Sequence, residues 1–124
     1  MRDHRSLRAW QEARLVTALV LRASRTCWKP WAGALFQQLQ RASLSVQLNI
    51  AEGSSFGASA TYRRHLGIAY GSAIETGELI ELAADEQIIL SPAADELLAH
   101  SRNTQRLLLG LLKRHRPMGV EPAP

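Results

Sequence analysis

Carboxylate and histidine side chains in the second half of this 124-residue chain are of the types that could hold a metal ion or transfer protons. Glu75, Glu78 and Glu81 follow one another in three-residue steps, which drift around a helix, so these three carboxylates cannot face one point. Glu96 and His100 are four residues apart, the spacing of an ordinary pair on a helix surface. The sequence lacks the Glu-x-x-His pairs that di-metal sites use in helical proteins. We therefore expect no metal site, no cofactor and no catalytic residue, and a di-metal enzyme is the least supported of three hypotheses.

Other reactive residues do not indicate an enzyme either. His4, His65 and His115 stand beside arginines, where a lone histidine is more often a surface residue than a catalytic one. Cys27 is the single cysteine and has no second thiol for a disulfide or a metal site, so we expect a reducing compartment and a small buried side chain. No apolar run reaches the roughly 18 residues that a membrane span requires. We expect a cytoplasmic protein that makes no membrane contact.

Basic residues are concentrated in the first half of the chain, whose overall net charge is +4. Residues 1–64 contain ten Lys and Arg against three acidic residues, whereas residues 65–124 contain five against eight. Such polarity suits a polyanionic partner or complementary faces on neighbouring subunits, although single helix-surface charges are often merely solvated. The candidate nucleic-acid-binding residues lie on and around the first expected helix: Arg5, Arg8, Arg14, Arg22, Arg25 and Lys29.

A second set of polar residues lies at helical spacing between apolar positions. One polar stripe occupies residues 41–52, and two further polar residues stand in apolar company within residues 68–82. If these segments form an antiparallel hairpin about a loop centred near residues 56–57, the two sets face each other. We expect an ion pair between Arg41 and Glu75, because an unpaired charge between apolar stripes is costly. The expected network consists of Gln38, Arg41, Ser45, Asn49, Glu52, Ser72 and Glu75.

Two interpretations of this polar network are open. It could be a binding or catalytic site, or it could be a structural device that fixes the register of two helices. We favour the structural interpretation, because buried polar groups need partners wherever they lie and these residues supply each other.

Helices must position these residues, and local patterns predict where the helices lie. The first is expected from about residue 5 to about residue 25, and Pro30 breaks it because proline cannot continue a helix without losing a backbone hydrogen bond. A second helix restarts near Trp31. The residues expected on the buried side of the first helix are Leu7, Trp10, Ala13, Val16, Thr17, Val20 and Leu21.

The segment SLSVQLNI, residues 43–50, alternates polar and apolar residues as a half-buried strand does. A single strand among helices would leave its backbone N–H and C=O groups without partners, so we predict that this segment is helical. As a helix it is apolar on two faces. One face carries Leu35, Leu39, Ala42, Val46 and Ile50, and the other carries Leu44, Leu48 and Ala51.

The third helix shows the clearest pattern, since its apolar residues keep an unbroken 4-3 spacing after a start that Ser59 or Thr61 can cap. In the fourth, Ser91 suits the N-cap, Pro92 the first turn, and Pro117 the end. We expect an all-α protein with one domain at residues 1–116 and a disordered tail at 117–124. The expected core residues are Tyr62, Leu66, Ala69, Ala73, Thr76, Ile80 and Ala83, followed by Leu97, Ser101, Thr104, Leu108 and Leu111.

The second and third helices carry more apolar surface than the interior of one chain requires. A helix in a four-helix arrangement buries one stripe, yet Leu44, Leu48, Ile68, Leu79 and Leu82 lie outside that stripe. We expect a homo-oligomer in which neighbouring subunits cover these residues.

Two segments resemble a known protein family. "QLQRASLSVQLNIAEG" at residues 38–53 and "LGIAYGSAIETGELIELA" at residues 66–83 closely resemble the four-helix bundle proteins encoded in ribosomal-RNA intervening sequences. Those proteins are relatives of the accessory proteins of diversity-generating retroelements. The resemblance extends over about residues 5–115.

The resemblance implies an antiparallel up-down four-helix bundle that assembles into a ring, usually a pentamer, and that is suspected of binding RNA or DNA. It implies no catalytic activity. The leading hypothesis is a non-enzymatic, ring-forming accessory protein that binds RNA or DNA non-specifically through its basic surface. The alternative is an oligomeric scaffold for a protein partner such as a polymerase, without nucleic-acid contact of its own.

Overall fold

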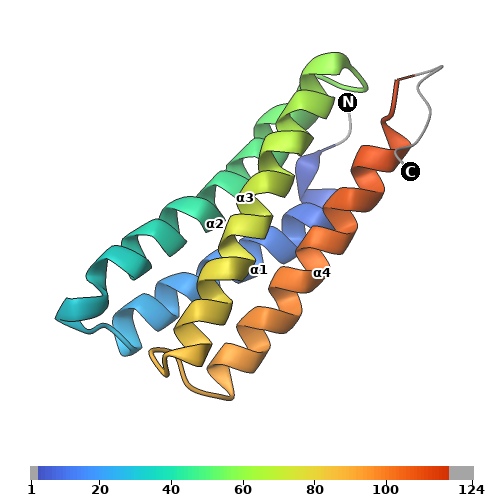
Figure 1. Cartoon of the computed structure of the whole chain (residues 1–124). Helices are drawn as coiled ribbons and strands as arrows, with labels where there is room; N and C mark the ends of the chain where they lie inside the picture. Colours follow the sequence, from blue (N-terminus) through green and yellow to red (C-terminus); the bar gives the residue numbers. More distant parts are fainter. Residues whose placement is uncertain (1–2, 118–124) are drawn as a thin grey trace.

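The computed structural model describes residues 3–117, and over that range the chain forms four long α-helices and two 3₁₀ turns (Figure 1). Successive helices run up and down, so the prediction of an all-α, antiparallel four-helix bundle is confirmed. The α2–α3 loop, the start of α1 and the end of α4 share one end of the bundle, which we call the loop end. The elements are η1 (His4–Ser6), α1 (Arg8–Thr26), η2 (Pro30–Ala32), α2 (Gly33–Ser54), α3 (Ala60–Asp85) and α4 (Ala93–Arg114).

Most of the predicted helix limits hold, and the exceptions have local causes. The SLSVQLNI segment lies inside α2, and Ser59 caps α3 by accepting a hydrogen bond from the backbone N–H of Tyr62 over 3.1 Å. The first helix begins at residue 8 and not 5, because residues 4–6 form the separate turn η1. The predicted tail, apart from Pro117, lies outside the described residues.

The start of α4 differs from the prediction, since the N-cap position is Pro92 and not Ser91. The loop before it turns inward after Gln87, whose φ is +58°, and buries Ile88 and Ile89 in the core. These two apolar side chains anchor the loop, so tertiary packing and not the serine hydroxyl sets where α4 begins.

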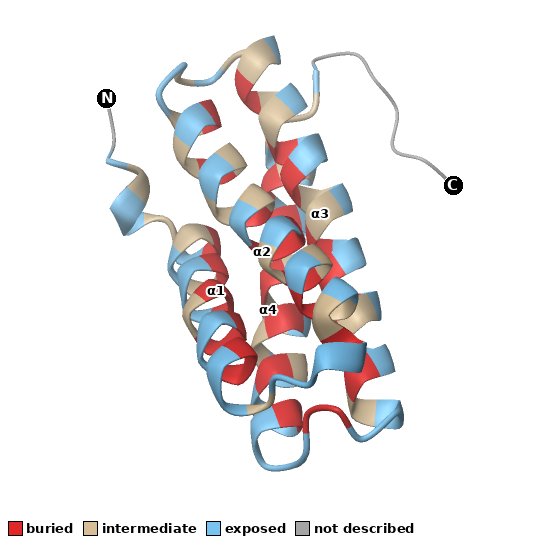
Figure 2. Ribbon diagram, turned by 90° about the vertical axis from the view of Figure 1, so that its left-hand side faces the viewer, coloured by how far each residue is buried: buried red, intermediate tan, exposed pale blue. Residues whose placement is uncertain are grey.

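The buried residues lie on the sides of the helices that face one another (Figure 2). They form two apolar clusters with a layer of hydroxyl-bearing residues between them. One cluster, which includes Phe36 and Ile80, fills the end of the bundle opposite the loop end. The other includes Ile50 and Leu66 and fills the loop end. Between them lies the hydroxyl layer, formed by the buried residues Thr17, Ser43, Thr76, Ser101 and Thr104.

The hydroxyl layer is satisfied mainly by backbone carbonyl groups of the same helices. Thr76 Oγ1 donates to the Ser72 carbonyl oxygen over 2.7 Å, and Thr104 Oγ1 donates to that of His100 over 2.8 Å. No buried side-chain N or O atom among the described residues lacks a partner. Hydrogen bonds therefore offset the free-energy cost of removing these polar groups from water.

The predicted core stripes of α3 and α4 are confirmed, since all twelve of their residues are buried. Leu21 was wrongly placed on the buried side of α1. It is 39% exposed, while Leu19 is buried, because Leu21 lies beyond the edge of the stripe that α1 turns inward.

The helices α2 and α3 approach closely at the loop end. Gly53 is buried near the end of α2, and a Cβ atom added there would lie 2.6 Å from the Cβ of His65. The α2–α3 loop then turns at Gly57, whose φ is +66°. None of the helices described between residues 3 and 117 has both the length and the apolar character needed to cross a membrane.

Candidate nucleic-acid interface

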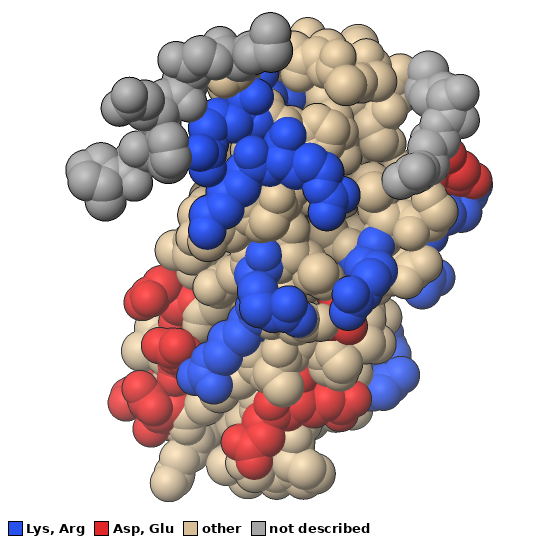
Figure 3. Space-filling view, turned by 90° about the vertical axis from the view of Figure 1, so that its right-hand side faces the viewer, with Lys and Arg blue, Asp and Glu red and all other residues tan. Residues whose placement is uncertain are grey.

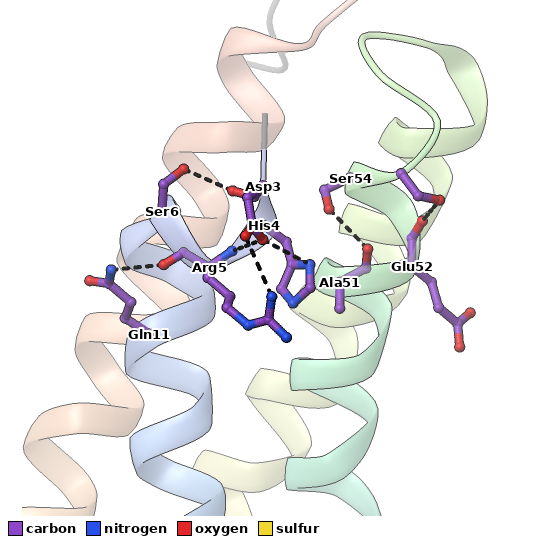
Figure 4. Close-up of polar contacts among 9 residues, drawn as sticks. Asp3, His4, Arg5, Ser6, Gln11, Ala51, Glu52 and Ser54 are labelled. Atoms are coloured by element: carbon purple, nitrogen blue, oxygen red, sulfur yellow. Dashed lines mark hydrogen bonds and ion pairs between the residues drawn. The ribbon is translucent and has the colours of Figure 1, made fainter. Parts of the chain in front are cut away.

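The turn η1 fixes the chain just ahead of α1 (Figure 4). The backbone N–H of Arg5 donates to the Asp3 carboxylate over 3.0 Å, and the Arg5 guanidinium lies 3.4 Å from the same carboxylate. The backbone hydrogen bond holds the pKa of Asp3 below its ordinary value. Gln11 Nε2 donates to the Arg5 carbonyl oxygen over 2.9 Å and ties the turn to α1. Arg5 therefore has a carboxylate partner within its own turn.

The six cations predicted from the first helix are all exposed, but they do not gather on one surface. The helix α1 runs the length of the bundle, so Arg5 and Arg8 lie at the loop end while Arg22, Arg25 and Lys29 lie at the opposite end. Arg22 lines a hollow of about 80 Å³ together with Glu96 of α4. Arg22 therefore shares its surroundings with an acidic residue.

A groove at the loop end joins the start of α1 to the last turns of α4. Its volume is about 340 Å³, and its cationic residues are Arg8 from α1 and Arg106 and Arg114 from α4. The remaining lining residues are Ser6, Leu7, Ala9, Leu107, Gly110 and Leu111. We call this feature the arginine groove. The α4 side of the groove was not predicted from the sequence, because residues 65–124 carry a net negative charge and the basic residues at the end of α4 are outnumbered in that sum.

A second hollow of about 280 Å³ adjoins the arginine groove and shares Leu7, Leu111 and Arg114 with it. It extends under the α2–α3 loop to Tyr62 and His115, whose rings meet edge to face with centroids 4.9 Å apart. The two hollows are therefore neighbours at the loop end.

Basic and acidic residues are separated along the long axis of the bundle, and not between one helix and another. Figure 3, which looks from the α4 side, shows Lys and Arg over the loop end and the middle, and acidic residues toward the opposite end. Among residues 3–117, the loop end carries three acidic residues, Asp3, Glu12 and Glu52. Its cations are Arg5, Arg8, Arg63, Arg64, Arg106, Lys113, Arg114 and Arg116.

Polar side chains form a row along the contact between α2 and α3. Gln38 Nε2 donates to the Glu75 carboxylate, and the hydroxyl groups of Ser45 and Ser72 lie 2.8 Å apart. The row continues toward the loop end, where Asn49 Nδ2 donates to Ser45 Oγ over 3.2 Å. Its last member is His65, whose Nδ1 lies 2.9 Å from Asn49 Oδ1 and whose ring stacks on Phe56.

Two residues expected in this row do not join it. Arg41 is exposed and forms no ion pair with Glu75, whose carboxylate is taken by Gln38, so the predicted Arg41–Glu75 pair was wrong. The antiparallel register places Gln38, one turn earlier on α2, opposite Glu75. Glu52 is also exposed, and in Figure 4 its carboxylate points away from the neighbouring contacts. The side chains of the row satisfy each other at the helix contact, as a register-fixing device requires.

The surplus apolar residues of α2 and α3 are exposed in the single chain, with one exception. Leu48 is 51% and Leu82 50% exposed, and Leu44 and Ile68 are exposed to a similar extent. Leu79 is only half-buried and packs against the Phe36 cluster, so it belongs in part to the chain's own core.

The acidic and histidine residues form pairs between helices. His100 Nδ1 lies 2.8 Å from the Glu12 carboxylate of α1, so its partner is not the expected Glu96. Glu81 lies 3.8 Å from Arg102 of α4. Within residues 3–117 no three His, Cys, Asp or Glu side chains are grouped so that they could hold a metal ion.

Comparison with known proteins identifies a matching family and a solved structure with a similar fold. The model of the family described as 23S rRNA-intervening sequence protein matches residues 5–110. A crystal structure of a protein with unknown function from the S23 ribosomal protein family of Bacteroides thetaiotaomicron has a TM-score of 0.75 and 18% sequence identity. The alignment covers 85% of this chain and 98% of that chain. No curated protein matches this chain. Neither description names an enzymatic activity.

Proposed function

The chain belongs to the 23S rRNA-intervening sequence protein family, and from this premise we propose that it is a non-enzymatic accessory protein that binds RNA or DNA through the basic loop end of its bundle. The observation that carries the proposal is the gathering of eight Lys and Arg residues at one end of the described bundle, against Asp3, Glu12 and Glu52. A polyanion that contacts several of these cations releases condensed counterions, which is the main source of non-specific affinity.

Sequence readout is not part of the proposal. The cations at the loop end come from several elements, whereas a major-groove recognition helix presents its contacts from a single helix. Contacts of this kind position a phosphate backbone but do not discriminate between bases.

Self-association strengthens the proposal, because each copy adds the same cations. We propose that the exposed apolar residues of α2 and α3, Leu44, Leu48, Ile68 and Leu82, form the contact between subunits of a ring. Five subunits is the number that the family resemblance implies. Sedimentation velocity should show an oligomer at micromolar concentration, and Leu48→Glu should dissociate it. A wild-type monomer would rule the ring out.

The binding experiment is a titration of fluorescently labelled single-stranded and duplex RNA over a range of salt concentrations. If about four phosphates of a single strand are contacted, the logarithm of the binding constant should fall with the logarithm of salt concentration with a slope of about −3. An Arg8→Glu, Arg106→Glu double variant should bind much more weakly while the oligomer persists. Absence of binding to either RNA at low salt would refute the proposed function.

A protein partner is the second candidate, and a specific observation favours it. At the end of the bundle opposite the loop end, Trp31 is 72% and Leu90 is 62% exposed, and Trp28 is also exposed. Exposed tryptophan is common at protein interfaces and rare elsewhere on surfaces. A polymerase is the partner class that the resemblance seen in the sequence implies. Retention of a polymerase by the wild type but not by Trp31→Ala, with no RNA binding, would favour the scaffold.

A further inference from the structure

We infer that the arginine groove holds a single unpaired nucleotide, with its phosphate on Arg8, Arg106 and Arg114 and its sugar and base over the leucine floor. The inference rests on the proposed function, since it names the part of the nucleic acid that the basic end takes. It commits to single-stranded in preference to duplex nucleic acid.

The first argument is the uncompensated charge of the groove. Arg106 donates to the neutral side-chain oxygen of Asn103, and within the described part of the chain no carboxylate lies within ion-pair distance of Arg8, Arg106 or Arg114. Arg5 and Arg102, in contrast, pair with Asp3 and Glu81. Three arginines from two helices thus line the groove without a carboxylate partner. A phosphate is the anion whose geometry suits several guanidinium donors at once.

The second argument is the apolar floor between these arginines. Leu7 and Leu107 are half-buried and Leu111 is buried at the base of the groove. A volume of about 340 Å³ lies in the range of small-molecule sites, well above what one phosphate fills. A phosphate alone would leave the apolar floor of the groove in contact with water. A duplex keeps its bases stacked inside, so they would not reach this floor. An unpaired nucleotide offers both an anion for the arginines and an apolar body for the floor.

The third argument is the open space above Gly110. This residue is exposed within α4, and a Cβ atom added to it would meet no other atom within 4 Å. The absence of a side chain leaves the groove open between Arg106 and Arg114. A larger side chain here would occupy the site without disturbing the core, which gives a direct test.

The groove also lies apart from the proposed subunit contact. Its lining residues come from η1, α1 and α4, whereas the exposed leucine and isoleucine residues of that contact are on α2 and α3. Substitutions in the groove should therefore change nucleic-acid binding without changing the oligomer.

The experiment compares three probes: a single-stranded RNA, the duplex of the same length, and inorganic polyphosphate of matched charge. Two variants change the groove, Gly110→Leu by filling it and the double variant Arg106→Gln, Arg114→Gln by removing two charges. Two controls are matched to them, Ala99→Leu at an exposed position of the same helix and the double variant Arg22→Gln, Arg25→Gln at the opposite end.

The double variant of the groove should lower the affinity for single-stranded RNA by about tenfold or more, and the double control by much less. Gly110→Leu should weaken binding of single-stranded RNA about fivefold and leave polyphosphate binding unchanged, while Ala99→Leu should change neither. Leucine is the better helix former, so a loss in Gly110→Leu cannot be ascribed to unfolding.

Each other result has a definite meaning. If the two arginine double variants lose equal affinity for single-stranded RNA, binding is spread over the surface. That result would refute the groove as the binding site but would not contradict the proposed function. Undiminished single-strand binding by Gly110→Leu, or preference for the duplex, would overturn the unpaired nucleotide. Failure of the wild type to bind any nucleic acid at low salt would overturn the proposed function and the inference together.

Discussion

The close approach of α2 and α3 at Gly53 makes the effect of a single methyl group predictable. In an open helical position Gly→Ala raises the free energy of unfolding by roughly 0.5–1 kcal/mol, because alanine loses less backbone entropy on folding. At Gly53 the new Cβ would lie 2.6 Å from the Cβ of His65 and 3.1 Å from Cδ1 of Tyr62. The nearer atom is fixed to the backbone of α3, so the two helices must move apart.

Overpacking of this kind costs about 1–3 kcal/mol, which exceeds the entropic gain. We expect Gly53→Ala to lower the free energy of unfolding by about 1–2 kcal/mol. At Gly110 a Cβ would meet nothing within 4 Å, so Gly110→Ala should raise it by up to about 1 kcal/mol. The same substitution thus changes sign between two helices of one protein.

The assay is equilibrium unfolding in urea, followed by far-ultraviolet circular dichroism at one fixed protein concentration, since self-association would shift the midpoint. The slope of the transition should be unchanged in both variants, so that the midpoints report stability. If Gly53→Ala unfolds at the wild-type urea concentration or above it, the packing argument at the loop end is wrong.

Three smaller predictions concern polar contacts. Ser59→Ala removes the N-cap of α3 and should cost about 1 kcal/mol in urea unfolding, and an unchanged midpoint would show that the cap contributes nothing. Glu75→Ala should cost less than about 1 kcal/mol, because its carboxylate is exposed and Arg41 does not depend on it; a much larger loss would reinstate a buried ion pair. The pKa of Asp3 is lowered by the Arg5 backbone N–H, so its carboxylate stabilises η1 above its unfolded pKa, and that contribution is lost as the pH falls through the folded pKa. An Arg5 amide resonance that does not move in an NMR titration through this range would contradict the contact.

Helical periodicity predicted the core well where the pattern was long and unbroken. Tyr62, Leu66, Ala69 and Ala73 of α3 follow the 4-3 spacing, and all are buried. The same rule failed for Leu21, which stands at the edge of the α1 stripe, where the spacing alone does not say which side of the edge faces the core. It also missed the anchoring of the α3–α4 loop by Ile88 and Ile89, because loop burial depends on contacts with distant helices.

The arginine groove could not be found from charge sums over halves of the chain. Arg8 and Arg106 are nearly a hundred residues apart, and they meet because α1 and α4 run in opposite directions. The available signal was the up-down topology itself, which places the start of the first helix beside the end of the last. The network between α2 and α3 was closer to prediction, since the register followed from the loop centre, but which of two neighbouring side chains reaches Glu75 depends on rotamers.

The hydroxyl layer divides the interior into two halves that could open separately. Its side chains bond mainly to carbonyl groups of their own helices, and one bond crosses the bundle, from Thr17 Oγ1 to the Ser43 carbonyl oxygen. Fraying near the α2–α3 loop therefore need not disturb Phe36 and Ile80 at the other end. Amide hydrogen exchange would then separate into two groups with different opening free energies. An anion bound at the loop end would slow amide exchange only in the group around Ile50 and Leu66. Exchange rates in that half of the protein would therefore report whether the site is occupied.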